Sequence, residues 1–208
     1  MIHLRAAFLS VSATLTAACS SPAPPAVPPS DTSTFPALRD SGYAATTLIR
    51  DYPMPPARFR AWVEDGNKFV AGFEESGSIA KPVDTVYLTG DWPGPGATRR
   101  VELADGHYVL ERVVANTPDR FEYQIWAMTN AAGRNVDHVH GVQQFDANAT
   151  GGTTLTWTYK VLPNARWKRP FVGRFVRNEI TPFLAGSLDN LEAWAAQEVA
   201  GEQVAGEG

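Results

Sequence analysis

Cysteine is nearly absent from this chain of 208 residues, in which Cys19 is the only one. A disulfide framework and a cysteine-built zinc site are therefore excluded. The chain also lacks an excess of positive charge, because 18 basic residues stand against 22 acidic ones and the net charge is −4. We therefore expect no nucleic-acid partner. No G-x-S-x-G motif occurs, so the usual signature of a serine nucleophile is missing as well.

The composition that remains is globular, with 44% hydrophobic and 19% charged residues, as in ordinary folded proteins. Six Trp, six Tyr and ten Phe are enough aromatic residues to line a core or a pocket. The length suits one domain with accessory segments, since single domains commonly have about 100–200 residues.

The N-terminus has the pattern of a secretory signal. Arg5 precedes the uncharged run Ala6–Ala18, which is shorter than the roughly 20 residues needed to cross a bilayer. Thr16-Ala17-Ala18-Cys19 resembles the lipobox of bacterial lipoproteins, although such motifs usually carry Leu where Thr16 stands. The resemblance implies that Cys19 is acylated and becomes the new N-terminus. The alternative is an ordinary signal peptide cut near Ala18, with Cys19 a bystander.

The lipobox resemblance also implies a location. An acylated protein would be a membrane-anchored lipoprotein of the cell envelope, on the periplasmic or extracytoplasmic face. Ser20 follows the cysteine, and in a Gram-negative cell this residue, rather than Asp, would suggest the outer membrane. The choice between inner and outer membrane stays open.

Proline and glycine content divides the rest of the chain. Residues 20–36 hold six of the sixteen prolines, which favour extended polyproline II and a semi-rigid spacer. We therefore expect a signal peptide at 1–18, a lipidated cysteine and Pro-rich tether at 19–40, and a folded domain at 41–197. The Gly- and Glu-rich residues 198–208 are expected to form a flexible tail.

The hydrophobic pattern predicts one strand, one or two helices, six strands and a long helix. Tyr43–Asp51 is rich in β-branched residues, and a helical spacing of apolar residues follows Pro55-Pro56. The expected six strands are Val83–Thr89, Ala97–Ala104, His107–Ala115, Arg120–Met128, Val136–Phe145 and Thr153–Val161. From Arg166 onward a helical period returns.

Asp105-Gly106 is a favoured two-residue hairpin turn. Such a turn would pair Val101 with Leu110 and Arg99 with Arg112, and the apolar face of each strand should look inward. The candidate cavity residues are Arg99, Val101, Leu103, Tyr108, Leu110, Arg112, Phe121, Tyr123, Ile125, Leu155, Trp157 and Tyr159, together with Leu184 and Leu188 of the closing helix.

Three stretches in this order resemble the START-like or SRPBCC superfamily, and within it the polyketide cyclase/dehydrase-like group. They are Gly94–Leu103 with Asp105-Gly106, then Leu110–Val113 and Gly152–Trp157, followed by the helix Leu184–Ala196. The resemblance implies an α+β helix-grip fold, in which a curved seven-stranded antiparallel sheet wraps around a long C-terminal helix. Members bind lipids, sterols, hormones and polyketides in a cavity, and a minority are enzymes.

A loop rich in proline and glycine joins two of the predicted strands. Its residues are Trp92, Pro93, Gly94, Pro95 and Gly96. In hormone-binding relatives the corresponding loop is a gate over the cavity mouth, so the resemblance implies a gate here. The alternative is a rigid turn with Trp92 covering the core.

The charged candidates have structural alternatives. Arg99 and Arg112 could bind a carboxylate or phosphate head group, but we expect both at an exposed rim, with their charged ends in water. The predicted register places Glu111 on the outer face beside Arg100. His138 and His140 share one strand face, yet no third ligand has a supporting spacing. We therefore expect no metal, no cofactor and no catalytic residue.

A basic and aromatic stretch follows the last predicted strand. Residues 166–177 carry five positive and no negative charges, as in helices that lie on anionic membranes. The candidate membrane-contact residues are Arg166, Trp167, Lys168, Arg169, Phe171 and Arg174. The alternative is a solvated basic face whose aromatics close the cavity. Thr181-Pro182 should then kink the helix or start a new one.

Together these patterns predict a membrane-anchored binding protein that encloses a hydrophobic or amphipathic, lipid-like molecule. One alternative is an acid/base enzyme of the polyketide cyclase kind. Another is a cell-envelope interaction module whose cavity is filled by its own aromatic side chains. The sequence does not identify the ligand or the oligomeric state.

Overall fold

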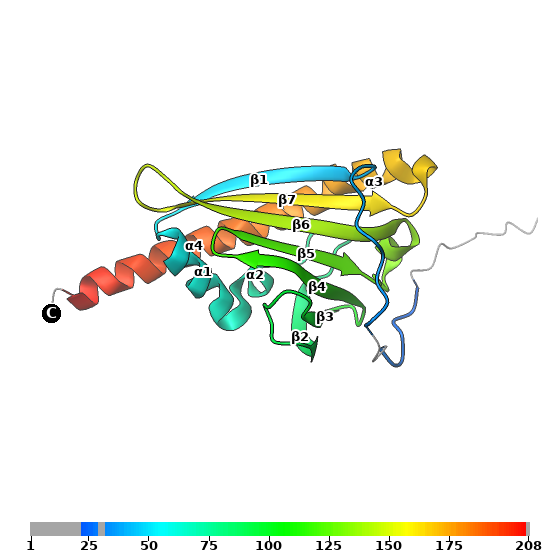
Figure 1. The fold of residues 1–208 in the computed structure, drawn as a ribbon, viewed down its shortest axis with the longest axis horizontal. Coiled ribbons are helices and arrows are strands. Elements are labelled where there is room, and N and C mark those ends of the chain that lie inside the picture. The colour runs from blue at the N-terminus through cyan, green and yellow to red at the C-terminus, as the bar shows by residue number, and fades with distance from the viewer. Residues whose placement is uncertain (1–21, 29–31, 207–208) are drawn as a thin grey trace, which may run out of the picture.

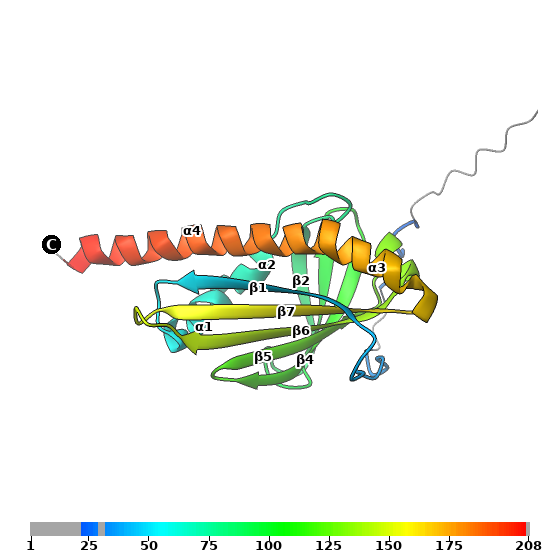
Figure 2. The ribbon, with the colours of Figure 1, turned by 90° about the horizontal axis from the view of Figure 1, so that it is seen from above.

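The structure is a computed structural model that describes residues 22–28 and 32–206. Its sheet has seven antiparallel strands in the order β1-β7-β6-β5-β4-β3-β2, and the C-terminal helix crosses one face (Figures 1 and 2). The strands are β1 (Ala44–Tyr52), β2 (Pro82–Thr89), β3 (Thr98–Leu103), β4 (Tyr108–Thr117), β5 (Arg120–Trp126), β6 (Val136–Ala147) and β7 (Thr153–Pro163). The helices are α1 (Pro56–Glu64), α2 (Lys68–Ala71), α3 (Arg169–Phe175) and α4 (Thr181–Gly206). The predicted α+β helix-grip fold is confirmed.

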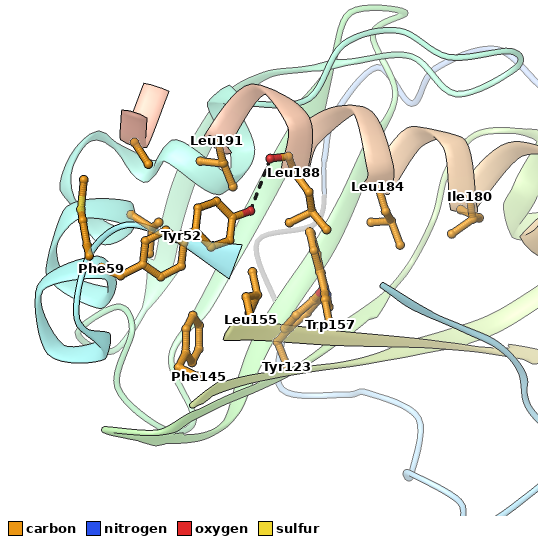
Figure 3. Close-up of a cluster of buried hydrophobic side chains, with 13 residues drawn as sticks. Tyr52, Phe59, Tyr123, Phe145, Leu155, Trp157, Ile180, Leu184, Leu188 and Leu191 are labelled. Carbon is orange, nitrogen blue, oxygen red and sulfur yellow. Dashed lines mark hydrogen bonds between the residues drawn. The ribbon is translucent and has the colours of Figure 1, made fainter. Parts of the chain in front are cut away.

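The main core lies between the curved sheet and α4 (Figure 3). Leu184, Leu188 and Leu191 recur at spacings of four and three residues and are fully buried, because this spacing keeps them on the helix face that meets the sheet. Tyr52 at the end of β1 donates its hydroxyl to the Leu188 carbonyl at 3.3 Å. Burial raises the pKa of this phenol far above its usual value, so the hydroxyl remains a donor.

The β3–β4 hairpin has a longer turn than the sequence analysis predicted. Ala104 belongs to the turn together with Asp105-Gly106, since the Leu103 amide donates to the His107 carbonyl at 2.8 Å. Gly106 has a φ of +80°, the left-handed conformation that closes a three-residue hairpin loop. The predicted two-residue turn is therefore wrong by one residue.

This one-residue difference changes which side chains of β4 face inward. Arg99 pairs with Glu111, and not with Arg112 as predicted. A slip of one residue turns every side chain of a strand to the opposite face. Glu111 therefore faces the concave side, whereas Tyr108 and Leu110 pack with Trp126 in a separate cluster.

The chain before β1 covers this separate cluster, and we call residues 22–28 and 32–40 the outer strap. The Phe35 ring meets Trp126 edge-on, with centroids 6.0 Å apart, and the Arg112 guanidinium lies 3.7 Å from the Phe35 centroid. Gln124 donates its side-chain amide to the Pro36 carbonyl at 2.9 Å. The described part of the predicted tether therefore contacts the sheet through Phe35 and Pro36, while most of its residues remain exposed. It lies over the outer face of β4 and β5, which carries apolar side chains.

Helix α3 runs on into α4 without a break in the coil (Figure 2). Thr181-Pro182, where a kink or a new start was expected, directly follows the turn that joins the two helices. A π-turn over Val176–Ile180 joins α3 to α4, and such single wide turns are a known way to adjust a helix. The Thr181 amide and hydroxyl both donate to the Val176 carbonyl. Thr181 has helical φ and ψ, so it is not an N-cap. Helix α4 extends to Gly206 and thus includes most of the stretch expected to be a flexible tail.

Candidate ligand cavity

A cavity of about 280 Å³ lies between the concave face of the sheet, the helices and the loop after β2. Most of its lining is apolar or aromatic, as is usual for small-molecule sites. The predicted residues that line it are Trp92, Pro93, Arg99, Val101, Leu103, Phe121, Tyr123, Ile125, Trp157, Tyr159 and Leu184. The sheet and α4 thus bring together most of the residues that the strand pattern placed inward.

Five predicted cavity residues lie elsewhere. Tyr108, Leu110 and Arg112 are on the outer face under the strap, because the register of the β3–β4 hairpin differs from the prediction. Leu155 and Leu188 are fully buried in the main core and are not among the lining residues. Arg112 hydrogen-bonds Gln124 at 2.7 Å, and burial lowers the pKa of its guanidinium.

Trp92 and Pro93 of the predicted gate loop reach the cavity, whereas Gly94, Pro95 and Gly96 form a tight turn outside its lining. The Gly96 amide donates to the Val113 carbonyl at 2.9 Å, which ties the turn to β4. The Trp92 ring packs edge-on against Phe121. This loop therefore closes one end of the cavity with an aromatic side chain.

A buried charged pair lies inside the mostly apolar cavity, whose lining also includes the Arg60–Glu64 ion pair. Arg99 Nε donates to Glu111 Oε2 at 2.7 Å, and both side chains are less than a tenth exposed, at 7% and 6%. A second guanidinium nitrogen donates to Asn67 Oδ1 at 3.0 Å, and the Trp92 ring covers the guanidinium at 3.9 Å. The rim position expected for Arg99 is therefore wrong, because its partners compensate for the loss of water.

The sequence analysis missed Glu111 and Asn67 as cavity residues. Glu111 was placed outside by the predicted turn, and only the true loop length corrects that placement. Asn67 adopts the left-handed conformation with φ of 52°, which asparagine tolerates better than most residues. The neighbouring Gly66, which also has a positive φ, made the Gly66-Asn67 dipeptide the one local sequence signal for this turn.

Two tyrosines bring hydroxyls to the cavity. Tyr123 accepts a hydrogen bond from Trp157 Nε1 at 2.9 Å, and burial raises its pKa well above the usual value. Burial also raises the pKa of Tyr159, with a further increase from the nearby Glu111 charge. Among the described residues the Tyr159 hydroxyl has no hydrogen-bond partner. The cavity therefore contains a neutral phenol that is free to donate.

Residues 47–196 match the family described as polyketide cyclase / dehydrase and lipid transport. The chain belongs to this family. The expected membership of the START-like or SRPBCC superfamily is thereby confirmed. No curated protein matches the chain.

Solved structures share the fold of this family member. Ara h 8.0201 is 19% identical with a TM-score of 0.53, over 75% of this chain and 99% of its own. Major latex-like protein 151 from Panax ginseng is 12% identical with a TM-score of 0.55, over 74% and 99%. A protein from Thermus thermophilus is 15% identical with a TM-score of 0.54, over 74% and 98%. These low identities show the fold alone.

The two histidines of β6 face away from the cavity. His138 Nε2 hydrogen-bonds the Tyr43 hydroxyl at 2.9 Å, and its other ring nitrogen meets Asp137. His140 Nε2 bonds Glu122 at 2.6 Å; burial lowers the pKa of His140 despite this carboxylate. The described residues contain no group of three His, Cys, Asp or Glu side chains that could hold a metal ion.

The candidate membrane-contact residues lie at one end of the molecule. Arg166, Trp167 and Lys168 form a short helical turn, and Arg169, Phe171 and Arg174 belong to α3. Cys19, the predicted lipidation site, lies outside the described residues. Within the described part of the chain, no helix has the length and apolarity to span a membrane.

Proposed function

We propose that this protein binds a hydrophobic or amphipathic, lipid-like molecule in its cavity. The observation that carries the proposal is the contrast between a mostly apolar lining and the buried Arg99–Glu111 ion pair within it. Moving the apolar body of a ligand from water into the cavity would lower the free energy by about 25 cal/mol per Å² of buried apolar surface. One polar group on the same molecule would then meet the ion pair.

The Arg99–Glu111 ion pair limits what that polar group can be. Glu111 has one carboxylate oxygen engaged by Arg99, and Tyr159 has a free hydroxyl. A ligand hydroxyl could donate to Glu111 and accept from Tyr159, whereas a second carboxylate would be repelled by Glu111. We therefore infer a neutral hydroxyl or carbonyl end, and a sterol-like or polyketide-like ligand in preference to a free fatty acid.

We further propose that Cys19 is acylated and anchors the protein to a membrane of the cell envelope, on its periplasmic or extracytoplasmic face. The lipobox-like Thr16-Ala17-Ala18-Cys19 sequence supports this proposal. The domain would then take up its ligand from, or deliver it to, the membrane at which it is held.

The position of Glu111 also supports a second function, acid/base catalysis on a carbonyl compound. Its carboxylate lies in the cavity close enough for its charge to raise the pKa of Tyr159. A carboxylate base beside a neutral phenol donor is a pair that can enolise a carbonyl. Ligand turnover would distinguish this function from binding alone.

Native mass spectrometry with lipid extraction, on the full chain purified from its own host, tests the proposed function. We expect one co-purifying amphiphile per chain. If the protein is a carrier, the mass of this amphiphile should stay the same when it is incubated with the protein, and if the protein is an enzyme, its mass should change. A chain that is empty and also fails to bind a fluorescent sterol or fatty-acid probe would refute binding.

A cavity-filling variant makes this test specific. Val101→Phe adds volume inside the cavity, since Val101 is buried and lines it, and we expect it to reduce bound ligand at least about tenfold. Ile49→Phe is the matched control, because Ile49 is 57% exposed on β1. Equal ligand content in both variants would place the ligand outside the cavity.

A further inference from the structure

Two large aromatic side chains stand exposed where the chain enters its long helix. Trp167 is 69% exposed and Phe171 is 65% exposed, more than any other aromatic side chain that the structure describes. Their rings meet edge-on, with centroids 6.4 Å apart and an interplanar angle of 82°. We call these two residues the aromatic pair. Apolar surface of this kind is rarely left in water without a partner.

The fold fixes the aromatic pair in this position. Val172 of α3 and Val176 of the π-turn that follows it are both 1% exposed and pack against valines of β6 and β7. The Lys168 ammonium donates to the Arg134 carbonyl at 2.6 Å, which attaches the preceding turn to the loop before β6. Because these contacts fix α3 against the sheet, the aromatic pair cannot turn inward without breaking this packing.

Positive charge surrounds the aromatic pair. Arg166, Arg169, Arg174 and Arg177 are exposed, and among the described residues none of them forms an ion pair with a carboxylate. Together with Lys168 they give residues 166–177 a charge of +5, which leaves −9 for the rest of the chain. A second copy of the same surface would be repelled, whereas an anionic surface would be attracted.

The start of the described chain lies at the same end of the molecule. The Pro22 carbonyl accepts a hydrogen bond from His107 Nε2 at 3.1 Å, beside the β3–β4 turn, and both views place the strap and α3 at this end (Figures 1 and 2). Pro22 is the third residue after Cys19, a span of at most about 11 Å. An acyl group on Cys19 would therefore hold the aromatic pair close to the bilayer; this step alone rests on the proposed anchor.

We propose that the aromatic pair and the surrounding arginines dock this end of the domain on an anionic membrane surface. The rings enter the interface between headgroups and acyl chains, and the guanidinium groups bind lipid phosphates. Phe175, one turn after Phe171, lines the cavity. The same helix thus links the docked surface to the ligand site.

Vesicle co-sedimentation tests this docking without the lipid anchor. The protein is the chain from residue 19 onward with Cys19→Ser, which keeps every residue that the structure describes. We expect binding to vesicles of phosphatidylcholine mixed with phosphatidylglycerol, weaker binding to phosphatidylcholine alone, and a loss of binding as salt rises. Trp167→Ala/Phe171→Ala should weaken binding to the anionic vesicles at least about tenfold.

The controls separate docking from unfolding, self-association and ligand binding. Ile49→Ala/Val83→Ala removes two apolar side chains at the sheet edges that are almost as exposed as the aromatic pair. This variant should bind vesicles as the parent chain does. A dye on Phe171→Cys, then the only cysteine, should shift to shorter emission wavelength on vesicles, unlike a dye on Ile49→Cys. Val101→Phe should still dock, so failure of the cavity proposal would be recognised separately.

Three results would overturn the proposal. The first is unchanged vesicle binding by Trp167→Ala/Phe171→Ala with urea unfolding like that of the parent chain. The second is equal affinity for neutral and anionic vesicles. The third is a dye response at Phe171→Cys that follows protein concentration without lipid, which would assign the aromatic pair to a dimer.

Discussion

Arg99 and Glu111 show at the residue scale how an apolar cavity can hold charge. Removing two ions from water costs several kcal/mol for each, and here the partners are a 2.7 Å ion pair, the Asn67 side chain and the face of Trp92. Each partner comes from a different element. The ion pair therefore depends on the whole fold, and the stability of the protein should be sensitive to the loss of either member.

Replacing one member of this pair should be more harmful than replacing both. Arg99→Ala leaves the Glu111 carboxylate buried without its counter-ion, and we expect the free energy of unfolding to fall by about 3–5 kcal/mol. Arg99→Met/Glu111→Leu leaves no buried charge and should cost less than the single change. Urea denaturation measures both.

The exposed pair Arg58–Glu202 provides the control for that experiment. Arg58→Ala should change the free energy of unfolding by less than about 1 kcal/mol. If Arg99→Ala and the double variant were equally destabilised, the cost would come from lost packing, and the charge argument would fail.

Strand contacts set the position of the cavity tyrosines at the scale of elements. Gly141 on β6 lies opposite Tyr123 on β5, and a Cβ at Gly141 would collide with the Tyr123 ring and hydroxyl. The ring thus lies flat over a glycine, and from there its hydroxyl reaches Trp157 on β7. Three strands are linked through this one close approach.

Gly141→Ala should therefore displace Tyr123 and break its hydrogen bond with Trp157. We expect a destabilisation of about 1–3 kcal/mol, which is typical of overpacking, with a change in near-ultraviolet circular dichroism from the indole. Thermal and urea unfolding give the stability.

Gly186→Ala is the matched control, because Gly186 is exposed on α4 and nothing lies near its added Cβ. It should stabilise the protein by about 0.5–1 kcal/mol, the usual difference between glycine and alanine in a helix. A Gly141→Ala chain as stable as the Gly186→Ala chain would mean that Tyr123 moves without cost.

The outer strap matters at the scale of the whole molecule. The sheet has two apolar faces, one covered by α4 and the other, over β4 and β5, by the chain before β1. The strap is therefore part of the folded unit. A domain cut at Ser41 would expose Trp126 and the side chains beside it to water.

Phe35→Ala should destabilise the protein by about 1–2 kcal/mol, through the loss of its edge-on contact with Trp126 and of the Arg112 guanidinium over its ring. Chemical denaturation measures the change. Val27→Ala, also in the strap but 82% exposed, should change stability by less than about 0.5 kcal/mol. Equal effects of the two substitutions would contradict a packed strap.

The predictable parts of the fold were those that depend on local patterns. Strand-type composition and alternating apolar residues located the seven strands, and the spacing of Leu184, Leu188 and Leu191 identified the helix that covers them. Alternation also predicted which side chains of β5 and β7 face the cavity. Tyr123 and Trp157 do line it. Each of these inferences needs only a few consecutive residues.

The site was less predictable, because its charged residues depend on one turn. The sequence showed a turn at Asp105-Gly106 but not whether Ala104 belongs to it, and that choice decides which face carries Glu111. The sequence by itself determined the order of elements, since periodicity and turn residues are local features, and the resemblance of its motifs to the START-like superfamily implied the helix-grip fold. Only the tertiary structure decided the charged pair and the strap on the outer face. The physical reason is that strand register and surface cover are set by contacts between segments far apart in the chain.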